Sequence, residues 1–483
     1  MSNLYNRREM LALLGAAGVA RPADGPRPNI LYIMADDHAA HAISAYGSRI
    51  NETPNIDRVA SGGVRLTNCF CTNSICTPSR AAILTGQYSH VNGVYTLNDK
   101  LDPKRNHVGK ELQKAGYQTA MIGKWHLATD PAGFDYWNIL PGQGVYYDPV
   151  FIEEGTRKKH SGYVTDLIGD FTLDWLKRRD KGKPFFALCH HKAPHRPWEP
   201  DPKYKSMFEG QTIPEPDNLF DHYEGRARSV STVTMRVGED MSQTDLKQPV
   251  PSGMKGDALR KWGYQLYIKD YLRCVRSVDD NVGRLLDYLD AEHLTENTIV
   301  IYTSDQGFFL GDHGWFDKRL MYEESLRMPF LMRYPGMIRP GWVNRDMVLN
   351  IDFAPMFLDY AGVAAPSEMQ GHSFRSCLEG HTPRDWRKSM YYRYWMHNTS
   401  DHHVPAHYGL RTDRWKLIYY YGKPLGMSGA EPPDTQPDWE LFDVRNDPRE
   451  MRNLYHDPKY AGLVKKLTAE LMQRQREVGD TPT

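Results

Sequence analysis

The 483-residue sequence is poor in cysteine and has no long apolar run. Its six cysteines include no Cys-x-x-Cys pair, so neither a disulfide-stapled scaffold nor a thiolate zinc site is expected. No apolar stretch is long enough to cross a bilayer, which argues against a stable membrane anchor. Lysine plus arginine and aspartate plus glutamate both total 60, so the formal charge is zero. Without a global field we expect no nucleic-acid partner, and any anion specificity has to be local.

The first residues have the pattern of an export signal. Arg7 and Arg8 form a twin-arginine pair, a short apolar run follows, and the small residues 18–20 resemble a cleavage site. We therefore assign residues 1–24 to Tat-like export and expect a periplasmic or secreted protein. A frayed amphipathic N-terminus is the alternative.

Buried strands alternate with helices along most of the chain. Residues 29–35 and 298–304 are continuous apolar runs, typical of strands buried on both faces of a parallel sheet. Aliphatic residues at helical spacing over 257–291 predict a long helix that covers the sheet. The pattern predicts an α/β fold, with a large, doubly wound, mostly parallel sheet as a catalytic domain over 25–383. Short aromatic-rich runs predict a smaller C-terminal subdomain with an antiparallel sheet over 384–483.

Oxygen-bearing side chains follow both strong strands. Asp36 and Asp37 come after the first strand, and Asp305 and Gln306 come after the second. Adjacent carboxylates repel each other unless a cation lies between them, and ligand sites in open α/β sheets collect at this edge. Oxygen donors suit Ca²⁺ or Mg²⁺ rather than zinc. We predict a divalent-cation site, with one solvent-facing and one capping aspartate as the ordinary alternative.

Lysine and histidine also follow predicted strands. Lys124 and His126 come after the strand at 118–122 and face the same side if the tip is extended. His195 lies in the polar stretch 190–197, again after a predicted strand. Lone histidines are usually structural, but a cluster at strand ends indicates a site.

A potential nucleophile stands at a predicted helix start, in Cys76-Thr77-Pro78-Ser79-Arg80. Pro78 suits the first turn of a helix. An anion reaching Cys76 would meet the helix N-terminus and Arg80 together, which suits an oxyanion ester. The alternative is a buried structural cysteine.

This C-x-P-S-R motif, with the Ala-x-x-Leu-Thr-Gly tail of residues 81–86, resembles the signature of the type I sulfatases. In that family a maturation enzyme oxidises the cysteine to formylglycine, whose hydrate attacks sulfur. One hydroxyl takes the sulfuryl group, and the other, once deprotonated, expels sulfate by re-forming the aldehyde. The resemblance covers residues 29–455 and implies an alkaline-phosphatase-like fold and sulfuric ester hydrolysis.

The resemblance also implies a ligand set for Ca²⁺. The ligands would be Asp36, Asp37, Asp305, Gln306 and the formylglycine at position 76. The family often has asparagine or histidine where this chain has Gln306. The glutamine offers the same kind of oxygen, but the departure leaves its role open.

Further roles follow from the same resemblance. Arg80, Lys124 and His126 would hold the hydrated aldehyde, with His126 removing the proton of the second hydroxyl. His195 would act as general acid, and Lys318 would hold the sulfate. A proton donor is needed because cleavage leaves an alkoxide on a sugar.

The stretch 315–329, with its Glu-Glu-Ser-Leu-Arg, resembles sulfatases that act on glycosaminoglycans and other sulfated polysaccharides. Substrate contacts are expected from His313, Arg319, His407 and Arg411. Arg411 could equally form a structural ion pair. The predicted function is removal of sulfate from a sulfated carbohydrate. The alternatives are a phosphonate or phosphate ester hydrolase on the same fold, and a silent polysaccharide-binding protein in which Cys76 stays unmodified.

Overall fold

The two apolar runs of the sequence are neighbours at the centre of a large sheet. β1 (Asn29–Ala35) and β9 (Thr298–Ser304) pair in parallel over their whole length, and every residue of both is buried. Burial on both faces explains why neither strand alternates with polar residues. The computed structural model describes residues 27–481, so the predicted export signal lies outside the described residues.

Within residues 27–481 the large sheet has ten strands, in the order β13-β2-β12-β9-β1-β8-β4-β5-β6-β7. The other strands of this sheet are β2 (Val64–Leu66), β4 (Gln118–Lys124), β5 (Tyr136–Leu140), β6 (Val150–Glu153), β7 (Thr156–Lys159), β8 (Phe185–His190), β12 (Phe330–Arg333) and β13 (Trp342–Asn344). The central strands from β9 to β5 are parallel, whereas β12 runs antiparallel to both of its neighbours. The mostly parallel α/β sheet is therefore confirmed.

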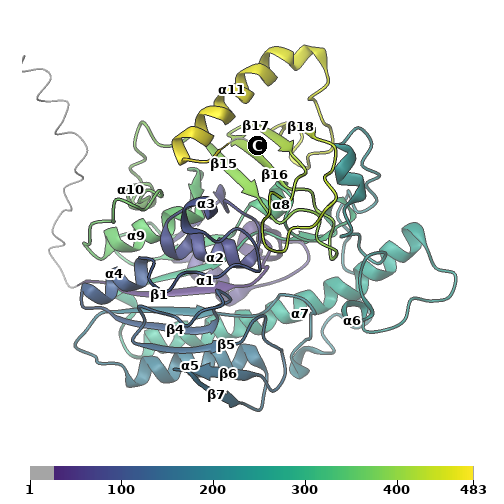
Figure 1. The fold of residues 1–483 in the computed structure, drawn as a ribbon. Helices are drawn as coiled ribbons and strands as arrows, with labels where there is room; N and C mark the ends of the chain where they lie inside the picture. The colour runs from purple at the N-terminus through teal and green to yellow at the C-terminus, as the bar shows by residue number, and fades with distance from the viewer. Residues whose placement is uncertain (1–26, 482–483) are drawn as a thin grey trace, which may run out of the picture.

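Helices cover both faces of this sheet (Figure 1). Their bounds are α1 (Pro54–Ser61), α2 (Cys76–Thr85), α3 (Ser89–Asn92), α4 (Val108–Lys114), α5 (Val164–Arg178), α6 (Gln243–Leu246), α7 (Gly256–Ala291), α8 (Glu323–Leu326), α9 (Phe353–Tyr360), α10 (Arg375–Leu378) and α11 (Ala461–Val478). Side chains of β1 alternate between two cores: Ile30, Tyr32 and Met34 pack with α2, α4 and α9, while Leu31 and Ile33 pack with α5 and α7. Among residues 27–481, no helix is both long and apolar enough to cross a membrane.

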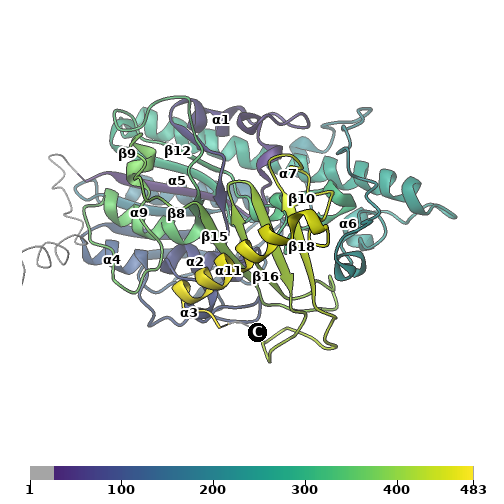
Figure 2. The same cartoon turned by 90° about the horizontal axis from the view of Figure 1, so that it is seen from above.

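A smaller antiparallel sheet follows in the chain, as predicted. In the described part it has the order β15-β16-β17-β18. Its strands are β15 (Ser389–Tyr394), β16 (His407–Thr412), β17 (Trp415–Tyr420) and β18 (Asp438–Asp443). α11 lies across this sheet (Figure 2). Its buried side chains join the same apolar core as α2 and α9, so the two sheets share a core.

Asp279 of α7 caps the start of α1, so a substitution there tests how the two helices pack. Its Oδ1 accepts hydrogen bonds from the backbone N–H groups of Asn55 (3.0 Å) and Ile56 (2.8 Å), and its side chain is buried. Asp279→Ala would leave these buried donors without a partner, so we expect it to lower the free energy of unfolding by about 1–3 kcal/mol. Urea denaturation of both proteins measures this loss.

The matched control is Asp287→Ala on the same helix. Asp287 pairs with Arg58 at 2.8 Å, but its side chain is 70% exposed. A surface pair of this kind contributes about 0–1 kcal/mol. Equal losses in the two variants would contradict a capping role for Asp279.

Candidate active site

The predicted site residues come together where the central strands end. Asp36 and Asp37 follow β1, Asp305 follows β9, and Lys124 is the last residue of β4. His195 lies in the loop after β8. Because these strands are parallel neighbours, their carboxyl ends meet at one edge of the sheet.

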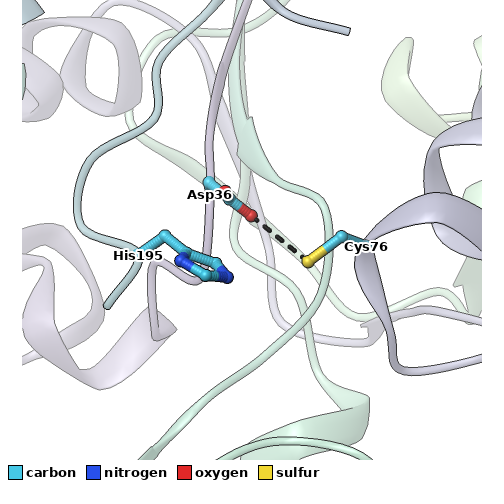
Figure 3. A group of neighbouring side chains, drawn as sticks. All are labelled: Asp36, Cys76 and His195. Atoms are coloured by element: carbon cyan, nitrogen blue, oxygen red, sulfur yellow. Dashed lines mark hydrogen bonds between the residues drawn. The ribbon is translucent and has the colours of Figure 1, made fainter. Parts of the chain in front are cut away.

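α2 begins at Cys76 and brings the cysteine to this edge. Ile75 before it is extended, Pro78 lies in the first turn, and Gly86 ends the helix with φ 65°. The Sγ atom of Cys76 lies 3.5 Å from Asp36 Oδ1, and Figure 3 shows these two side chains pointing toward each other with the His195 ring beside them. Burial raises the pKa of the Cys76 thiol, so an unmodified thiol stays protonated at neutral pH and is a poor nucleophile.

The carboxylates of Asp36, Asp37 and Asp305 are buried and offer oxygens within 4.8 Å of one another. Burial, helped by the charges of Asp36 and Asp305, raises the pKa of Asp37 to about 7. Burial and Asp36 likewise raise the pKa of Asp305 to about 6. Burial opposes ionisation of Asp36 too, but Lys124 and His195 hold its pKa well below its usual range.

Gln306 supplies a test of the predicted cation site. Its Nε2 donates to Asp37 Oδ1, while its Oε1 is buried and has no hydrogen-bond partner among the described residues. A buried acceptor without a donor, beside crowded carboxylates, is the arrangement that a hard cation satisfies. The donor set therefore fits Ca²⁺ or Mg²⁺.

Arg80 and Lys124 neutralise the side of the site nearest Asp36. Arg80 Nη2 lies 3.0 Å from Asp305 Oδ2 and 3.5 Å from Asp36 Oδ1. Its Nη1 donates to the carbonyl oxygen of Lys124 at 2.6 Å. Lys124 Nζ donates to Asp36 Oδ2 and also to Gln143 Oε1. The arginine thus ties α2 to β4 and β9.

His195 and Lys318 occupy the side nearest Asp37. Lys318 Nζ lies 2.7 Å and His195 Nε2 3.7 Å from Asp37 Oδ2. The Nδ1 atom of His195 lies 2.6 Å from the carbonyl oxygen of Arg196, so Nδ1–H donates there and Nε2 faces the site. Burial and the charge of Lys124 lower the pKa of His195.

His126 reaches the site by a different backbone path from the one predicted. The tip after β4 is not extended, because His126 has φ 56°. Its Nδ1 atom lies 3.4 Å from Thr77 Oγ1, beside Cys76. Burial and Lys124 lower the pKa of His126, so the ring is neutral in this structure.

Two of the residues expected to contact substrate are buried with partners of their own. His313 Nδ1 lies 3.0 Å from Asp221 Oδ2, and its side chain is buried. The His407 ring is buried between Tyr392 and Tyr394, with Nδ1 2.7 Å from the carbonyl oxygen of Pro405. In this structure neither ring is open to a sugar.

The two arginines of that set also have partners. Arg411 pairs with Glu323 at 3.2 Å, the structural pairing weighed as its alternative. Arg319 lies next to Lys318 and donates to the Tyr394 hydroxyl at 3.2 Å. Of the four residues, only Arg319 adjoins the site through its neighbour.

Gln143 also reaches the site, although it was not among the predicted site residues. It stands between Gly142 (φ 54°) and Gly144 (φ 66°), a tight turn that projects its side chain toward Lys124. A polar residue between two glycines after β5 was the available signal.

Comparisons with known proteins identify the family of this chain. The family model "Sulfatase" matches residues 28–363, and the model "N-sulphoglucosamine sulphohydrolase, C-terminal" matches residues 311–477. An N-acetylglucosamine-6-O-sulfatase of Bacteroides thetaiotaomicron is 43% identical over 517 residues, covering 97% of this chain and 90% of the relative. An ulvan-active sulfatase of Formosa agariphila is 28% identical, covering 94% of this chain and 82% of the relative.

Solved structures give the same result. BT4656 in complex with its substrate D-glucosamine-2-N,6-O-disulfate superposes with a TM-score of 0.89 at 43% identity, covering 94% of this chain and 98% of that chain. A phosphonate monoester hydrolase of Agrobacterium radiobacter shares the fold alone, with a TM-score of 0.72 at 20% identity, covering 94% and 96%. Because the sulfatase model matches well over half of the chain and the relatives span nearly all of it, the protein is a sulfatase and belongs to the sulfatase family.

Proposed function

We propose that the protein removes 6-O-sulfate from glucosamine-type residues of sulfated carbohydrates, with formylglycine made from Cys76 as nucleophile and Ca²⁺ as the bound cation. The substrate class rests on the 43% identical N-acetylglucosamine-6-O-sulfatase and on BT4656, which was solved with a 6-O-sulfated glucosamine. The observation that carries the mechanism is the position of Cys76. It is buried beside Asp36, whose carboxylate forms ion pairs with Arg80 and Lys124.

The chemistry of the site favours a modified cysteine. As a thiol, Cys76 is buried and protonated, so it offers no nucleophile for a sulfate ester. When present, formylglycine supplies a nucleophilic hydroxyl pair, and Ca²⁺ held by Asp36, Asp37, Asp305 and Gln306 supplies positive charge for the sulfate oxygens. The proposed maturation enzyme makes this aldehyde.

The residues on the two sides of the site divide the work. Arg80 and Lys124 lie on the side of Cys76 and Asp36, where they orient the nucleophile and offset its charge. His126, neutral and beside Thr77, accepts the proton whose removal releases sulfate. These are roles that the geometry permits at positions matching the family pattern.

His195 and Lys318 serve the leaving oxygen. Nε2 of His195 faces the site and must carry a proton to act as general acid. Its pKa is low in the structure, but the negative charge of a bound sulfate ester raises it again. Lys318, 2.7 Å from Asp37, holds the sulfate.

Three earlier predictions stay proposals. They are Tat-like export of residues 1–24 to the periplasm or the medium, a catalytic domain over 25–383, and a C-terminal subdomain over 384–483. A phosphonate or phosphate ester hydrolase is the second candidate function, favoured only by the shared fold.

Sulfate release from a panel of sugars tests the function directly. Matured protein should release sulfate from glucosamine 6-O-sulfate and N-acetylglucosamine 6-O-sulfate far faster than from 3-O-sulfated isomers, and faster than phosphate from the 6-phosphates. Cys76→Ala should fold normally and release none. The mass of the active protein should be lower than that of the encoded chain, because oxidation removes the sulfur. Wild-type activity in Cys76→Ala would rule out the mechanism.

Cation binding should depend on pH with a defined sign. Because folding raises the pKa of Asp37 to about 7 and of Asp305 to about 6, from about 3.9 in the unfolded chain, the cation-free protein loses stability as pH rises through this window. Ca²⁺ binds the ionised carboxylates, so the Ca²⁺-induced rise in Tm should be larger at pH 8 than at pH 5. Thermal melts with and without CaCl₂ measure it.

Asp37→Asn should abolish most of this Ca²⁺-induced rise. Asp312→Asn is the control, because Asp312 is buried but pairs with His41 instead. A rise that is the same at both pH values, or that survives in Asp37→Asn, would contradict the assigned ligands.

Substitutions on the two sides of the site should differ in how strongly their effect on kcat/KM depends on the leaving group. A nitrophenyl sulfate leaves as a stable phenolate, whereas a sugar alkoxide needs a proton, and general acid catalysis is worth about 10²- to 10⁴-fold. His195→Ala should therefore reduce kcat/KM much more for a sugar sulfate than for the aryl sulfate, while Lys124→Ala should reduce both alike. Equal losses on the two substrates for His195→Ala would mean that this residue binds sulfate and donates no proton.

A further inference from the structure

The turn that carries Lys318 has an unusual backbone. β10 (Phe309–Leu310) and β11 (Phe316–Asp317) form an antiparallel pair, and Lys318 follows β11 directly. The residues on both sides of the lysine lie in the left-handed region, with φ 80° at Asp317 and φ 92° at Arg319. Non-glycine residues adopt such values only where surrounding contacts hold them. The structure must therefore supply those contacts.

The Asp317 carboxylate makes several of these contacts at once. Its Oδ1 accepts a hydrogen bond from the backbone N–H of Lys318 at 2.8 Å and lies 3.4 Å from Arg319 Nε. Its Oδ2 lies 3.3 Å from His402 Nε2, and the residue is 2% exposed. Burial opposes the charge, but Lys318, His402 and Arg319 hold the pKa of Asp317 well below its usual range. The carboxylate is thus a charged junction within the turn.

The C-terminal part of the chain provides the other contacts that hold this turn. His402, in the loop between β15 and β16, has its Nδ1 atom 3.3 Å from the carbonyl oxygen of Thr234, and Thr234 N–H donates to the carbonyl oxygen of His402 at 2.9 Å. From β15, the Tyr392 hydroxyl donates to the carbonyl oxygen of Arg319 at 2.7 Å, and the Tyr394 hydroxyl accepts from Arg319 Nη1. The small sheet therefore fixes the backbone on the far side of Lys318.

We propose that Asp317 is a positioning residue for Lys318. Together with His402, Asp317 holds the lysine ammonium against Asp37. The distances distinguish the two carboxylates: Lys318 Nζ lies 2.7 Å from Asp37 Oδ2 but 3.9 Å from Asp317 Oδ1. Asp37 is the direct partner, while Asp317 fixes the turn through the backbone and adds a second negative charge behind the lysine. This inference rests on the proposed role of Lys318 in sulfate binding.

A double-mutant cycle tests it. Asp317→Asn keeps the shape and removes the charge, so kcat/KM on a 6-O-sulfated glucosamine should fall by about 10- to 100-fold, the size of loss found for residues that orient the ligands of a metal site. If Asp317 acts through Lys318, adding Asp317→Asn to Lys318→Ala should change kcat/KM by no more than about twofold, because the lysine is already gone. The inference would be overturned if the fold-losses in kcat/KM of the two single variants multiplied in the double variant, or if Asp317→Asn kept the wild-type kcat/KM.

Asp279→Asn is the structural control, since it alters a buried aspartate at the α1–α7 contact. Any loss it causes should be the same with and without Lys318. If Asp317→Asn does not fold, His402→Ala replaces it in the cycle. His402→Ala should reduce kcat/KM by less than Asp317→Asn, and it should cause no further reduction in the Lys318→Ala background. Full activity in Lys318→Ala would overturn the lysine's role and this inference together, whereas sulfate release by the wild type would still support the proposed function.

Discussion

The repulsion among the buried carboxylates of Asp36, Asp37 and Asp305 determines the arrangement of the whole site. Two unit charges 4.8 Å apart repel by about 3 kcal/mol at an effective dielectric constant near 20. Burial is the larger cost, and burial and repulsion together raise the pKa of Asp37 to about 7. Such a cluster persists only where positive charge is supplied, by Arg80 and Lys318 in the structure and by a cation as proposed.

The positive charge comes from two different kinds of element. Arg80 and Lys124 belong to α2 and β4, whose positions follow from the core of the parallel sheet. Lys318 comes from a turn with left-handed neighbours, held by the small C-terminal sheet. The side proposed to hold the nucleophile is therefore built into the main sheet, while the side proposed to face the leaving group depends on the packing of the second sheet.

The features that could be predicted from the sequence are those that depend on residues close together in the chain. Residues 29–35 and 298–304 are recognisable as strands because an unbroken apolar run fills most of each, and the residues that follow them directly are the proposed cation ligands. Contacts such as Gln143 with Lys124, or His402 with Asp317, join segments that no local pattern connects. His407 was expected to contact substrate, but the aromatic rings of its own sheet enclose it, and this enclosure depends on strand pairing that no local pattern shows.

Burial of Cys76 also limits when the proposed modification can take place. The cysteine is 1% exposed, and every residue of α2 around it is buried. Arg80 holds the helix through buried contacts with Asp305 and the carbonyl oxygen of Lys124. A maturation enzyme has to reach the thiol before α2 packs against β1 and β9, because opening the finished site would break these buried ion pairs. On the proposed mechanism, oxidation of Cys76 therefore precedes completion of the fold.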